Sequence, residues 1–348
     1  MRFINCLRHQ CCHVPPKPGW SGAKADGSGV KAATLVVWLC LLGVTCAAED
    51  LKVVCASRAE TPPMIDGALD EPCWQKAEVR SDFTSPGSGQ VLSRRTTMRV
   101  LYDQDHLYFG FEVFWDSAAL LNKGVAEIKG RYPEIKEGVW LKEWKYENTH
   151  GLELFLDPGA SGRNYYQMLF NAAGQCIGNY KCLFECFNIQ PVVKGAIQGN
   201  CWSVEMAYPA KNLKIGQEWG LNVCRNDETY YGIWKQVQGA YHNPKLFGRL
   251  VIGDYREWWE AAGGKEVRAQ LEALRSQSAR YAKRDNRFSA MVDQVAGEMD
   301  VMGKWAGQYP PVGRASFEQL YERYAGCRDK QARLQAYRET LELLTRLR

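Results

Sequence analysis

The sequence predicts a mainly β protein: an antiparallel β-sandwich followed by a C-terminal α-helical hairpin or small bundle. Between residues 50 and 253, about ten short segments rich in aromatic and β-branched residues lie between Gly, Pro and Asn-Asp turn signals. No helical periodicity alternates with these segments, whereas apolar residues recur at helical spacing after Gly253. The chain has 348 residues, 46% of them hydrophobic and 12% aromatic, which is the composition of a folded globular protein.

Residues 1–48 predict a leader that ends in a secretory signal peptide. Residues 32–48 carry no charge, follow Lys31 and precede Glu49. A basic flank, a short apolar core and small residues at 46–48 are typical of a signal cleaved near Glu49. The alternative is a transmembrane anchor, but as a helix the run spans about 25 Å against a hydrocarbon core of about 30 Å. We therefore expect a protein that is secreted or lies in the periplasm or cell envelope.

Loss of this leader changes both the charge and the cysteine content of the chain. Five basic residues and one acidic residue leave with it, so the net charge falls from +5 to +1. A nearly neutral chain lacks the positive surface of a nucleic-acid binder, and no nucleic-acid partner is expected. The thirteen cysteines fall to eight, an even number in an oxidising compartment. We expect at least one disulfide bond within the set Cys176, Cys182, Cys186, Cys201 and Cys224.

The β-region, residues 49–253, contains the expected strands in a regular series. A hairpin comes first, with strands at 97–102 and 107–114 on either side of the polar turn at 103–106. Apolar residues at every second position from Leu107 to Val113 are typical of a strand that buries one face. The further strands are expected at 151–156, 165–171, 176–180, 192–198, 202–207, 219–225, 233–238 and 247–252.

Residues 254–348 predict the helical tail. Apolar residues at helical spacing over 267–281, 288–302 and 317–344 indicate three amphipathic helices, with a break at Tyr309-Pro310-Pro311. Three helices joined by short breaks form a hairpin or small bundle. Such a tail is either a self-contained packing module or a docking surface for a protein partner or the cell envelope, and the sequence leaves both open.

The sequence lacks the motifs that would indicate an enzyme. It contains no Gly-x-Ser-x-Gly, no phosphate-binding Gly-x4-Gly-Lys-Ser/Thr and no His-Glu-x-x-His. Glu153, Asp157 and Glu205 would supply carboxylate pairs for glycoside hydrolysis, but the sequence does not place any two at the roughly 5–10 Å that this chemistry needs. We therefore expect a non-catalytic protein.

Seven motifs in a fixed order carry a family resemblance. They are residues 63–74 (PMIDGALDEPCW), 98–111 (MRVLYDQDHLYFGF), 151–158 (GLELFLDP), 165–174 (YYQMLFNAAG), 202–209 (WSVEMAYP), 219–225 (WGLNVCR) and 243–250 (NPKLFGRL). In this order they resemble carbohydrate-binding module family 9 (CBM9), whose sugar-binding β-sandwiches belong to the wider DOMON-like group. The resemblance covers roughly residues 53–252 and leaves the helical tail unexplained.

The resemblance implies a saccharide held between two aromatic faces and fixed by polar side chains. A pyranose face presents C–H groups that stack on aromatic rings, and its hydroxyls need planar donors and acceptors. Glu153 matches the family's acidic sugar contact and Tyr241 its second clamp aromatic. At the first clamp position the chain has Glu147, and Trp144 is the nearest aromatic residue. A polar residue that the family carries in strand 219–225 is replaced by Cys224.

The expected carbohydrate-binding residues are therefore Trp144, Glu153, Tyr241, Arg225 and Asn226. Each has a structural alternative. Glu153 would pair with neighbours on the sandwich surface, and Trp144 would belong to a short amphipathic helix. Arg225 and Asn226 would satisfy carbonyl groups at a strand end.

Two further expectations concern a cofactor and the function of the protein. A structural calcium ion of the kind the family often carries would take oxygens from Asp66, Asp70, Asp103 and Asp105, but turn chemistry explains these residues without an ion. We expect no cofactor. The leading function is secreted, non-catalytic binding of a carbohydrate or glycan ligand. The alternatives are a structural envelope protein with a degenerate ligand site and a haem-binding DOMON-like domain, whose nominal ligands are Met168, Met206, His150 and Lys181.

Overall fold

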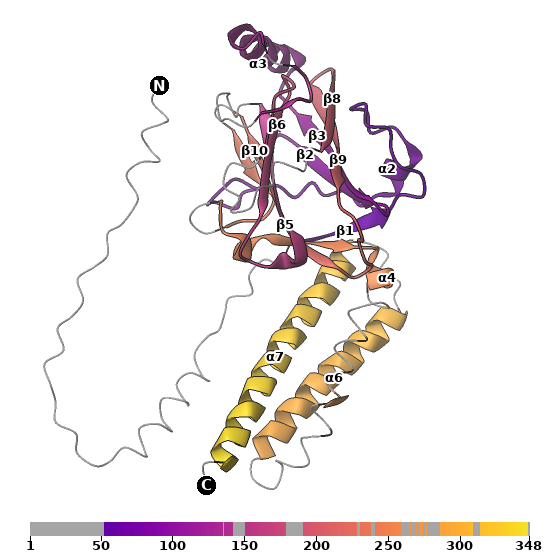
Figure 1. Cartoon of the computed structure of the whole chain (residues 1–348), viewed down its shortest axis with the longest axis vertical. Helices are drawn as coiled ribbons and strands as arrows, with labels where there is room; N and C mark the ends of the chain where they lie inside the picture. The colour runs from indigo at the N-terminus through magenta and orange to yellow at the C-terminus, as the bar shows by residue number, and fades with distance from the viewer. Residues whose placement is uncertain are drawn as a thin grey trace, which may run out of the picture. The chain divides into compact units, whose positions relative to one another are not determined.

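The structure is a computed structural model (Figure 1). It describes residues 52–134, 136–141, 150–178, 191–227, 230–237 and 241–258, and in the C-terminal region 265, 269, 272–273, 276, 286–308 and 314–346. The described strands are β1 (Val53–Arg58), β2 (Thr96–Tyr102), β3 (His106–Phe114), β4 (Trp140–Leu141), β5 (Gly151–Asp157), β6 (Tyr166–Asn171), β7 (Cys176–Gly178), β8 (Val192–Gln198), β9 (Cys201–Pro209), β10 (Glu218–Asn226), β11 (Tyr231–Ile233) and β12 (Gly248–Ile252). The described α-helices are α2 (Pro72–Lys76), α3 (Ala118–Arg131), α4 (Tyr255–Trp258), α6 (Asn286–Gln308) and α7 (Arg314–Arg346).

The twelve strands form one mixed sheet that β1 makes continuous. Its order is β4-β7-β6-β5-β10-β12-β1-β2-β3-β9-β8, with β11 on β10. Residues 53–56 of β1 pair with β12, and residues 57–58 pair with β2. Because β1 changes partners partway along its length, the described strands form one continuous mixed sheet, where two separate sheets of a sandwich were expected. Most neighbours are antiparallel as expected, but β1–β12, β1–β2 and β4–β7 are parallel.

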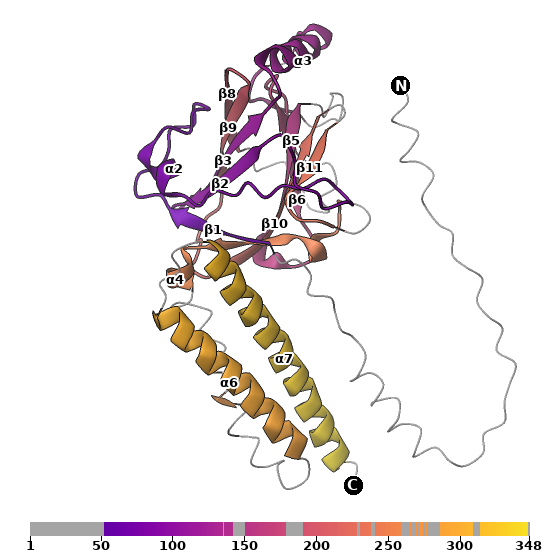
Figure 2. The ribbon, with the colours of Figure 1, turned by 180° about the vertical axis from the view of Figure 1, so that it is seen from behind.

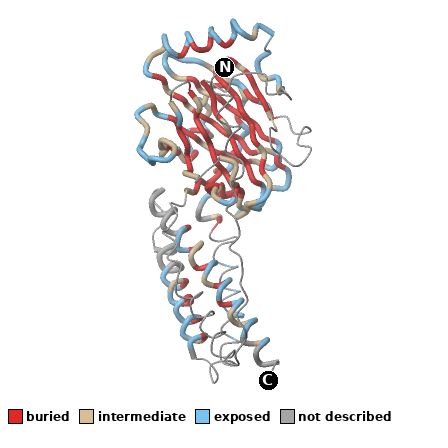
Figure 3. Tube along the Cα trace, turned by 90° about the vertical axis from the view of Figure 1, so that its left-hand side faces the viewer, coloured by how far each residue is buried: buried red, intermediate tan, exposed pale blue. Residues whose placement is uncertain are grey.

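The two halves of the sheet share one hydrophobic core. Alternate residues of β3, including Phe109 and Phe111, are buried in it, as the period-two pattern predicted. Leu154 on β5, Met206 on β9 and Leu221 on β10 enter the same core from strands far apart in the chain. Figure 3 shows the buried residues concentrated along the strands.

A buried carboxylate fastens the segment before α2 to the sheet. The Glu205 side chain on β9 is fully buried; its Oε2 accepts hydrogen bonds from the backbone N–H groups of Asp66 (2.9 Å) and Gly67 (2.8 Å). Its Oε1 accepts one from Nε1 of Trp74 (2.7 Å). Burial away from water raises the pKa of Glu205 to about 7. Gly67 has φ +97°, and a Cβ there would lie 2.6 Å from the backbone of Gly195; the close approach therefore requires glycine.

Several elements differ from expectation. The strand expected at 233–238 is the shorter β11, which begins at Tyr231, and β1 and β4 were not predicted. Helix α3 was also missed, because its apolar residues Leu121, Val125 and Ile128 form only a narrow stripe in a segment that contains two glycines. Its N-terminus is well defined, since the side chain of Ser117 accepts a hydrogen bond from the backbone N–H of Leu120.

The helices α6 and α7 lie side by side (Figures 1 and 2), as the apolar spacing over 288–302 and 317–344 predicted. The helix expected over 267–281 lies largely outside the described residues. The two helices share a hydrophobic cluster with Trp258, and Val53, Cys55 and Val251 belong to the same cluster. One of the two alternatives expected for the tail was a self-contained packing module. This alternative needs correction, because the helices also pack on residues of β1 and β12.

The expected disulfide is not seen among the described cysteines, all six of which are free thiols. Cys176, Cys201 and Cys224 lie on three different strands, while Cys182 and Cys186 lie outside the described residues. Burial raises the pKa of Cys176 to about 12, so this thiol is neutral and packs as an apolar group. The leader, residues 1–48, also lies outside the described part. Among the described helices, none combines the length and apolar character needed to cross a membrane.

Candidate functional site

One surface of the sheet gathers most of the polar and aromatic residues expected to bind a ligand. On β5, Leu152, Leu154 and Leu156 enter the core, so Glu153 and Phe155 lie on the opposite surface. The strand ladders place residues of β6, β10 and β11 with the same side-chain direction on this surface too. We call this surface the β5 face, defined by Glu153 and Phe155 (β5), Gln167 and Leu169 (β6), Cys224 and Asn226 (β10), and Tyr231 and Ile233 (β11).

Three polar side chains meet at the centre of this face. The Glu153 carboxylate accepts a hydrogen bond from Nδ2 of Asn226 (2.6 Å) on one oxygen and from Nε2 of Gln167 (3.0 Å) on the other. Oε1 of Gln167 is buried and has no hydrogen-bond partner within the described part of the chain. A buried acceptor of this kind costs free energy unless a donor reaches it. We call these three residues the Glu153 trio.

An aromatic layer lies next to the trio. Phe155 packs against Tyr165, Phe247 and His242 with ring centroids 5.7–5.9 Å apart. Half-buried Tyr241 packs on the same cluster. Burial, with Cys224 and Glu153 nearby, raises the pKa of Tyr241. The phenol is therefore close enough to Glu153 to sense its charge, and it stays neutral.

A hollow of about 460 Å³ opens beside Tyr241. We call it the tyrosine hollow; it is lined by Ser85, Pro86, Gln90, Val91, Leu92, Ser93, Tyr230, Tyr231 and Tyr241. Tyr231 is 43% exposed, so one of its surfaces is open to solvent. A hollow of this volume falls in the range of about 300–1,000 Å³ that small-molecule sites occupy.

The structure brings together three of the five residues that the sequence singled out. Glu153, Asn226 and Tyr241 lie on or against the β5 face. Trp144 lies outside the described residues, as does Glu147. Arg225 lies on the opposite side of β10 from the trio, because neighbouring residues of a strand point to opposite faces.

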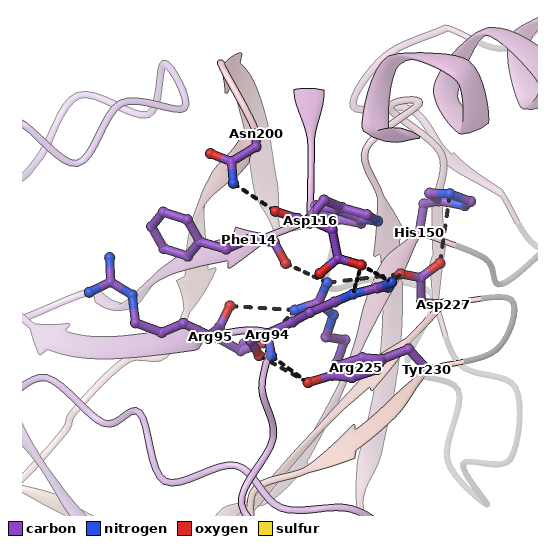
Figure 4. A network of polar contacts seen from close by, with 11 residues as sticks. Arg94, Arg95, Phe114, Asp116, His150, Asn200, Arg225, Asp227 and Tyr230 are labelled. Atoms are coloured by element: carbon purple, nitrogen blue, oxygen red, sulfur yellow. Dashed lines mark hydrogen bonds and ion pairs between the residues drawn. The ribbon is translucent and has the colours of Figure 1, made fainter. Parts of the chain in front are cut away.

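Arg225 performs the structural task that was its alternative interpretation. Its guanidinium is buried and donates hydrogen bonds to the carbonyl oxygens of Phe114 (2.7 Å) and Arg95 (3.4 Å) and to Oγ1 of Thr96 (3.2 Å) (Figure 4). Burial lowers the pKa of Arg225 to about 10, which leaves it charged at neutral pH. It ties the end of β10 to β2 and β3.

A network around Arg225 also holds Tyr230. The Tyr230 ring contacts two guanidinium groups, that of Arg94, 4.7 Å from the ring centroid, and that of Arg225, 5.1 Å away. Its hydroxyl accepts a hydrogen bond from the backbone N–H of Arg94 (2.6 Å). Arg94 in turn binds Asp116 and Asp227 (Figure 4). The sequence did not predict a ligand-binding role for Tyr230, Tyr231 or Gln167. Only the two adjacent tyrosines after an Asn-Asp turn would have pointed to this part of the chain.

The residues considered for other chemistries have structural contacts. Met168 and Met206 are buried in the core, and the ring of His150 stacks on Trp115 with centroids 5.9 Å apart. Lys181 lies outside the described residues. Oδ1 of Asp103 accepts hydrogen bonds from two backbone N–H groups of its own turn, and Asp66 accepts one from Ala68. No cluster of three His, Cys, Asp or Glu residues suited to a metal ion occurs within the described ranges.

Comparisons with known proteins were made against families, curated proteins and solved structures. A family 9 carbohydrate binding module from Caldicellulosiruptor kristjanssonii was solved in complex with cellotriose and with glucose. Both structures are 16% identical to this chain, with a TM-score of 0.41; they cover 58% of this chain and 94% and 95% of their own. A candidate carbohydrate-binding protein from Bacteroides uniformis is 12% identical, with a TM-score of 0.42, over 58% of this chain and all of its own.

No curated protein matches the chain. The model of the family described as "Carbohydrate family 9 binding domain-like" matches residues 65–254, a segment that contains every described residue of the β5 face and the tyrosine hollow. This match extends over more than half of the sequence, and the chain therefore belongs to the carbohydrate family 9 binding domain-like family.

Proposed function

We propose that this protein is a non-catalytic carbohydrate-binding protein whose ligand binds on the β5 face. One observation carries the proposal: in a member of a carbohydrate-binding family, the Glu153 trio and Tyr241 gather on one surface of the sheet. The trio offers carboxylate and amide oxygens to sugar hydroxyl groups, and the tyrosine ring offers a flat surface to the C–H groups of a pyranose.

The spare acceptor of the trio gives the site its specificity for hydroxyl groups. Asn226 and Gln167 already donate to Glu153, so they hold the carboxylate in place and partly satisfy its lone pairs. Oε1 of Gln167 has no such donor within the described part of the chain. A ligand hydroxyl that donates to this oxygen would remove the cost of leaving it unpaired, and an apolar ligand would not.

A second candidate, a structural envelope protein with a degenerate site, rests on a different feature of the same residues. Both carboxylate oxygens of Glu153 are engaged by side chains of the protein, and Cys224 beside them is buried. In that case the trio would only stabilise the sheet. The two functions predict opposite results in a sugar-binding assay.

The test is isothermal titration calorimetry of residues 49–348 against soluble neutral sugars, with pull-down on insoluble polysaccharides. Glu153→Ala and Tyr241→Ala should each weaken binding about tenfold or more, because each removes a direct contact. Glu127→Ala, on the exposed surface of α3, is the matched control and should bind as the unaltered protein does. Thermal unfolding of each variant verifies that it is folded. Absence of binding across the whole panel would reject the proposal and favour the structural role.

Secretion is part of the proposal and rests on the leader alone. A signal peptide cleaved near Glu49 would deliver the β5 face to a compartment that contains glycans. N-terminal sequencing of the protein exported by its host tests this. A mature chain that begins near Glu49 supports secretion, and one that retains residues 32–48 would point to an anchor.

A further inference from the structure

The tyrosine hollow and the Glu153 trio are parts of one continuous surface. Asn226 and Tyr231 stand directly opposite each other in the β10–β11 ladder, and Cβ atoms in such pairs are about 4.5–5.5 Å apart. Asn226 binds Glu153 at the trio, and Tyr231 lines the hollow. Tyr241 lines the hollow and packs on the cluster that contains Cys224, which pairs with Glu153 in the β5–β10 ladder. A ligand fixed at the trio therefore has the hollow directly beside it.

The wall of the hollow formed by residues 85–93 is held in place without a ligand. Thr84 and Ile233 exchange two backbone hydrogen bonds of 2.9 Å, and Ser85 closes the loop by donating to the carbonyl of Gln90 (2.7 Å). The Gln236 amide binds the same loop three times, donating to Thr84 Oγ1 and the Ser85 carbonyl and accepting from Gly87 N. A wall fixed in this way costs no ordering entropy when a ligand binds.

Two further sets of contacts hold residues of the hollow in place. A Cβ at Gly232 would lie 2.5 Å from Cδ1 of Leu92, so glycine at this position lets the wall pack directly on β11. Tyr230, which also lines the hollow, contacts the guanidinium groups of Arg94 and Arg225 (Figure 4). The hollow is therefore built into the fold by residues of four separate segments.

The chemistry of the lining restricts the occupant. Three tyrosines supply ring surface and hydroxyl groups, and Ser85, Ser93 and Gln90 supply further neutral donors and acceptors. None of the described residues that line the hollow carries a charged side chain. Arg94, the nearest described cation to the Tyr230 ring, is paired with Asp116 and Asp227. Glu153 stands at the neighbouring trio. An anionic group would find no charged partner among the described lining residues and would be repelled by Glu153.

We propose, building on the proposed function, that the tyrosine hollow is a second subsite for an uncharged sugar ring linked to the one bound at the trio. The ligand is then a neutral oligosaccharide of at least two rings. Tyr231 is the residue that determines the response to ligand length, because its exposed ring lies in the hollow while its cross-strand neighbour Asn226 lies in the trio.

The experiment compares matched ligand pairs by calorimetry on residues 49–348. The pairs are glucose with cellobiose and with maltose, galactose with lactose, and xylose with xylobiose. The disaccharide of the recognised pair should bind more tightly than its monosaccharide. Tyr231→Ala should weaken disaccharide binding about two- to tenfold more than it weakens monosaccharide binding. Tyr231→Phe keeps the ring and should retain most of the difference.

A second variant tests the same subsite without relying on correct folding of Tyr231→Ala. Val91 lines the hollow and is 81% exposed, so Val91→Trp fills the hollow without disturbing a packed residue. It should abolish the advantage of the disaccharide and spare the monosaccharide. Glucuronic and galacturonic acids, compared with glucose and galactose, test the charge argument and should bind at least about threefold more weakly.

Each outcome bears on one hypothesis or the other. Equal binding of mono- and disaccharide, or equal loss for both in Tyr231→Ala and Val91→Trp, would overturn the second subsite and leave the proposed function standing. Tighter binding of the uronic acids would overturn the neutral class. If neither the unaltered protein nor Glu153→Ala bound any sugar of the panel, the proposed function would be rejected, and this inference with it.

Discussion

Glu205→Gln tests how the burial of one carboxylate couples folding to pH. In the folded chain the pKa of Glu205 is raised from 4.5 to about 7 because burial disfavours the charged form. Between these two values the folded state binds more protons than the unfolded state, so the free energy of unfolding falls as pH rises. A difference of this size corresponds to about 3 kcal/mol, present below pH 4.5 and lost as pH rises through 7.

The glutamine variant does not titrate, so it should lack this fall. Urea unfolding followed by tryptophan fluorescence at pH 5, 6, 7 and 8 measures the free energy of unfolding of both proteins. The advantage of the natural protein over Glu205→Gln should shrink by about 2–3 kcal/mol across this range. It should be largest at pH 5 and smallest at pH 8, because only the carboxyl of the natural protein loses its proton over this range.

Glu112→Gln is the matched control on the neighbouring strand β3. Although burial opposes it, hydrogen bonds from Arg99 and Thr97 lower the pKa of Glu112. The stability due to Glu112 is therefore present above its unfolded pKa and is lost only as pH falls below that value. Its variant should differ from the natural protein by a constant amount between pH 5 and 8. If Glu205→Gln also gave a constant difference, burial would not govern this carboxyl.

Four further substitutions test three separate features of the fold by chemical or thermal unfolding. Gly67→Ala should destabilise by more than about 2 kcal/mol, since it combines φ +97° with a Cβ 2.6 Å from β8; Gly87→Ala, with φ +80° and open space, should cost about 1 kcal/mol. Arg225→Met should cost about 2–4 kcal/mol, because the Phe114 carbonyl loses a charged donor, and an unchanged midpoint would contradict the structural role. Ser117→Ala should cost about 1 kcal/mol and speed amide exchange in the first turn of α3, whereas unaltered exchange would show that the cap is dispensable.

Strand positions were predictable because a half-buried strand writes a period of two into the sequence. The alternation from Leu107 to Val113 fixed β3, and the same rule states that Arg225 and Asn226, as neighbours on a strand, point to opposite faces. Sequence reasoning nominated both for one site. The structure places Arg225 and Asn226 on opposite faces of β10. The alternation rule by itself would have allowed only one of them in the binding site.

The composition of the candidate site depended on strand pairing, which the sequence does not specify. Gln167 joins Glu153 because β6 pairs with β5, and Tyr231 joins Asn226 because β11 pairs with β10. The β5–β10 ladder, which brings Asn226 to Glu153, pairs residues up to 75 apart in the chain, and register is set by the packed core rather than by local propensity. The parallel pairs of β1 were hidden for the same reason. Family motifs led to Glu153 and Tyr241, but the wall at 85–93 belongs to none of them.

The contact between the helices and strands β1 and β12 has a practical consequence for protein engineering. Val53, Cys55 and Val251 share a hydrophobic cluster with Trp258 and with residues of α6 and α7. Cutting the chain after Gly253 would strip the cover from an apolar patch, and such a fragment is prone to aggregate. Anyone who fuses the sheet of this protein to an enzyme or a purification tag should carry the C-terminal helices along with it.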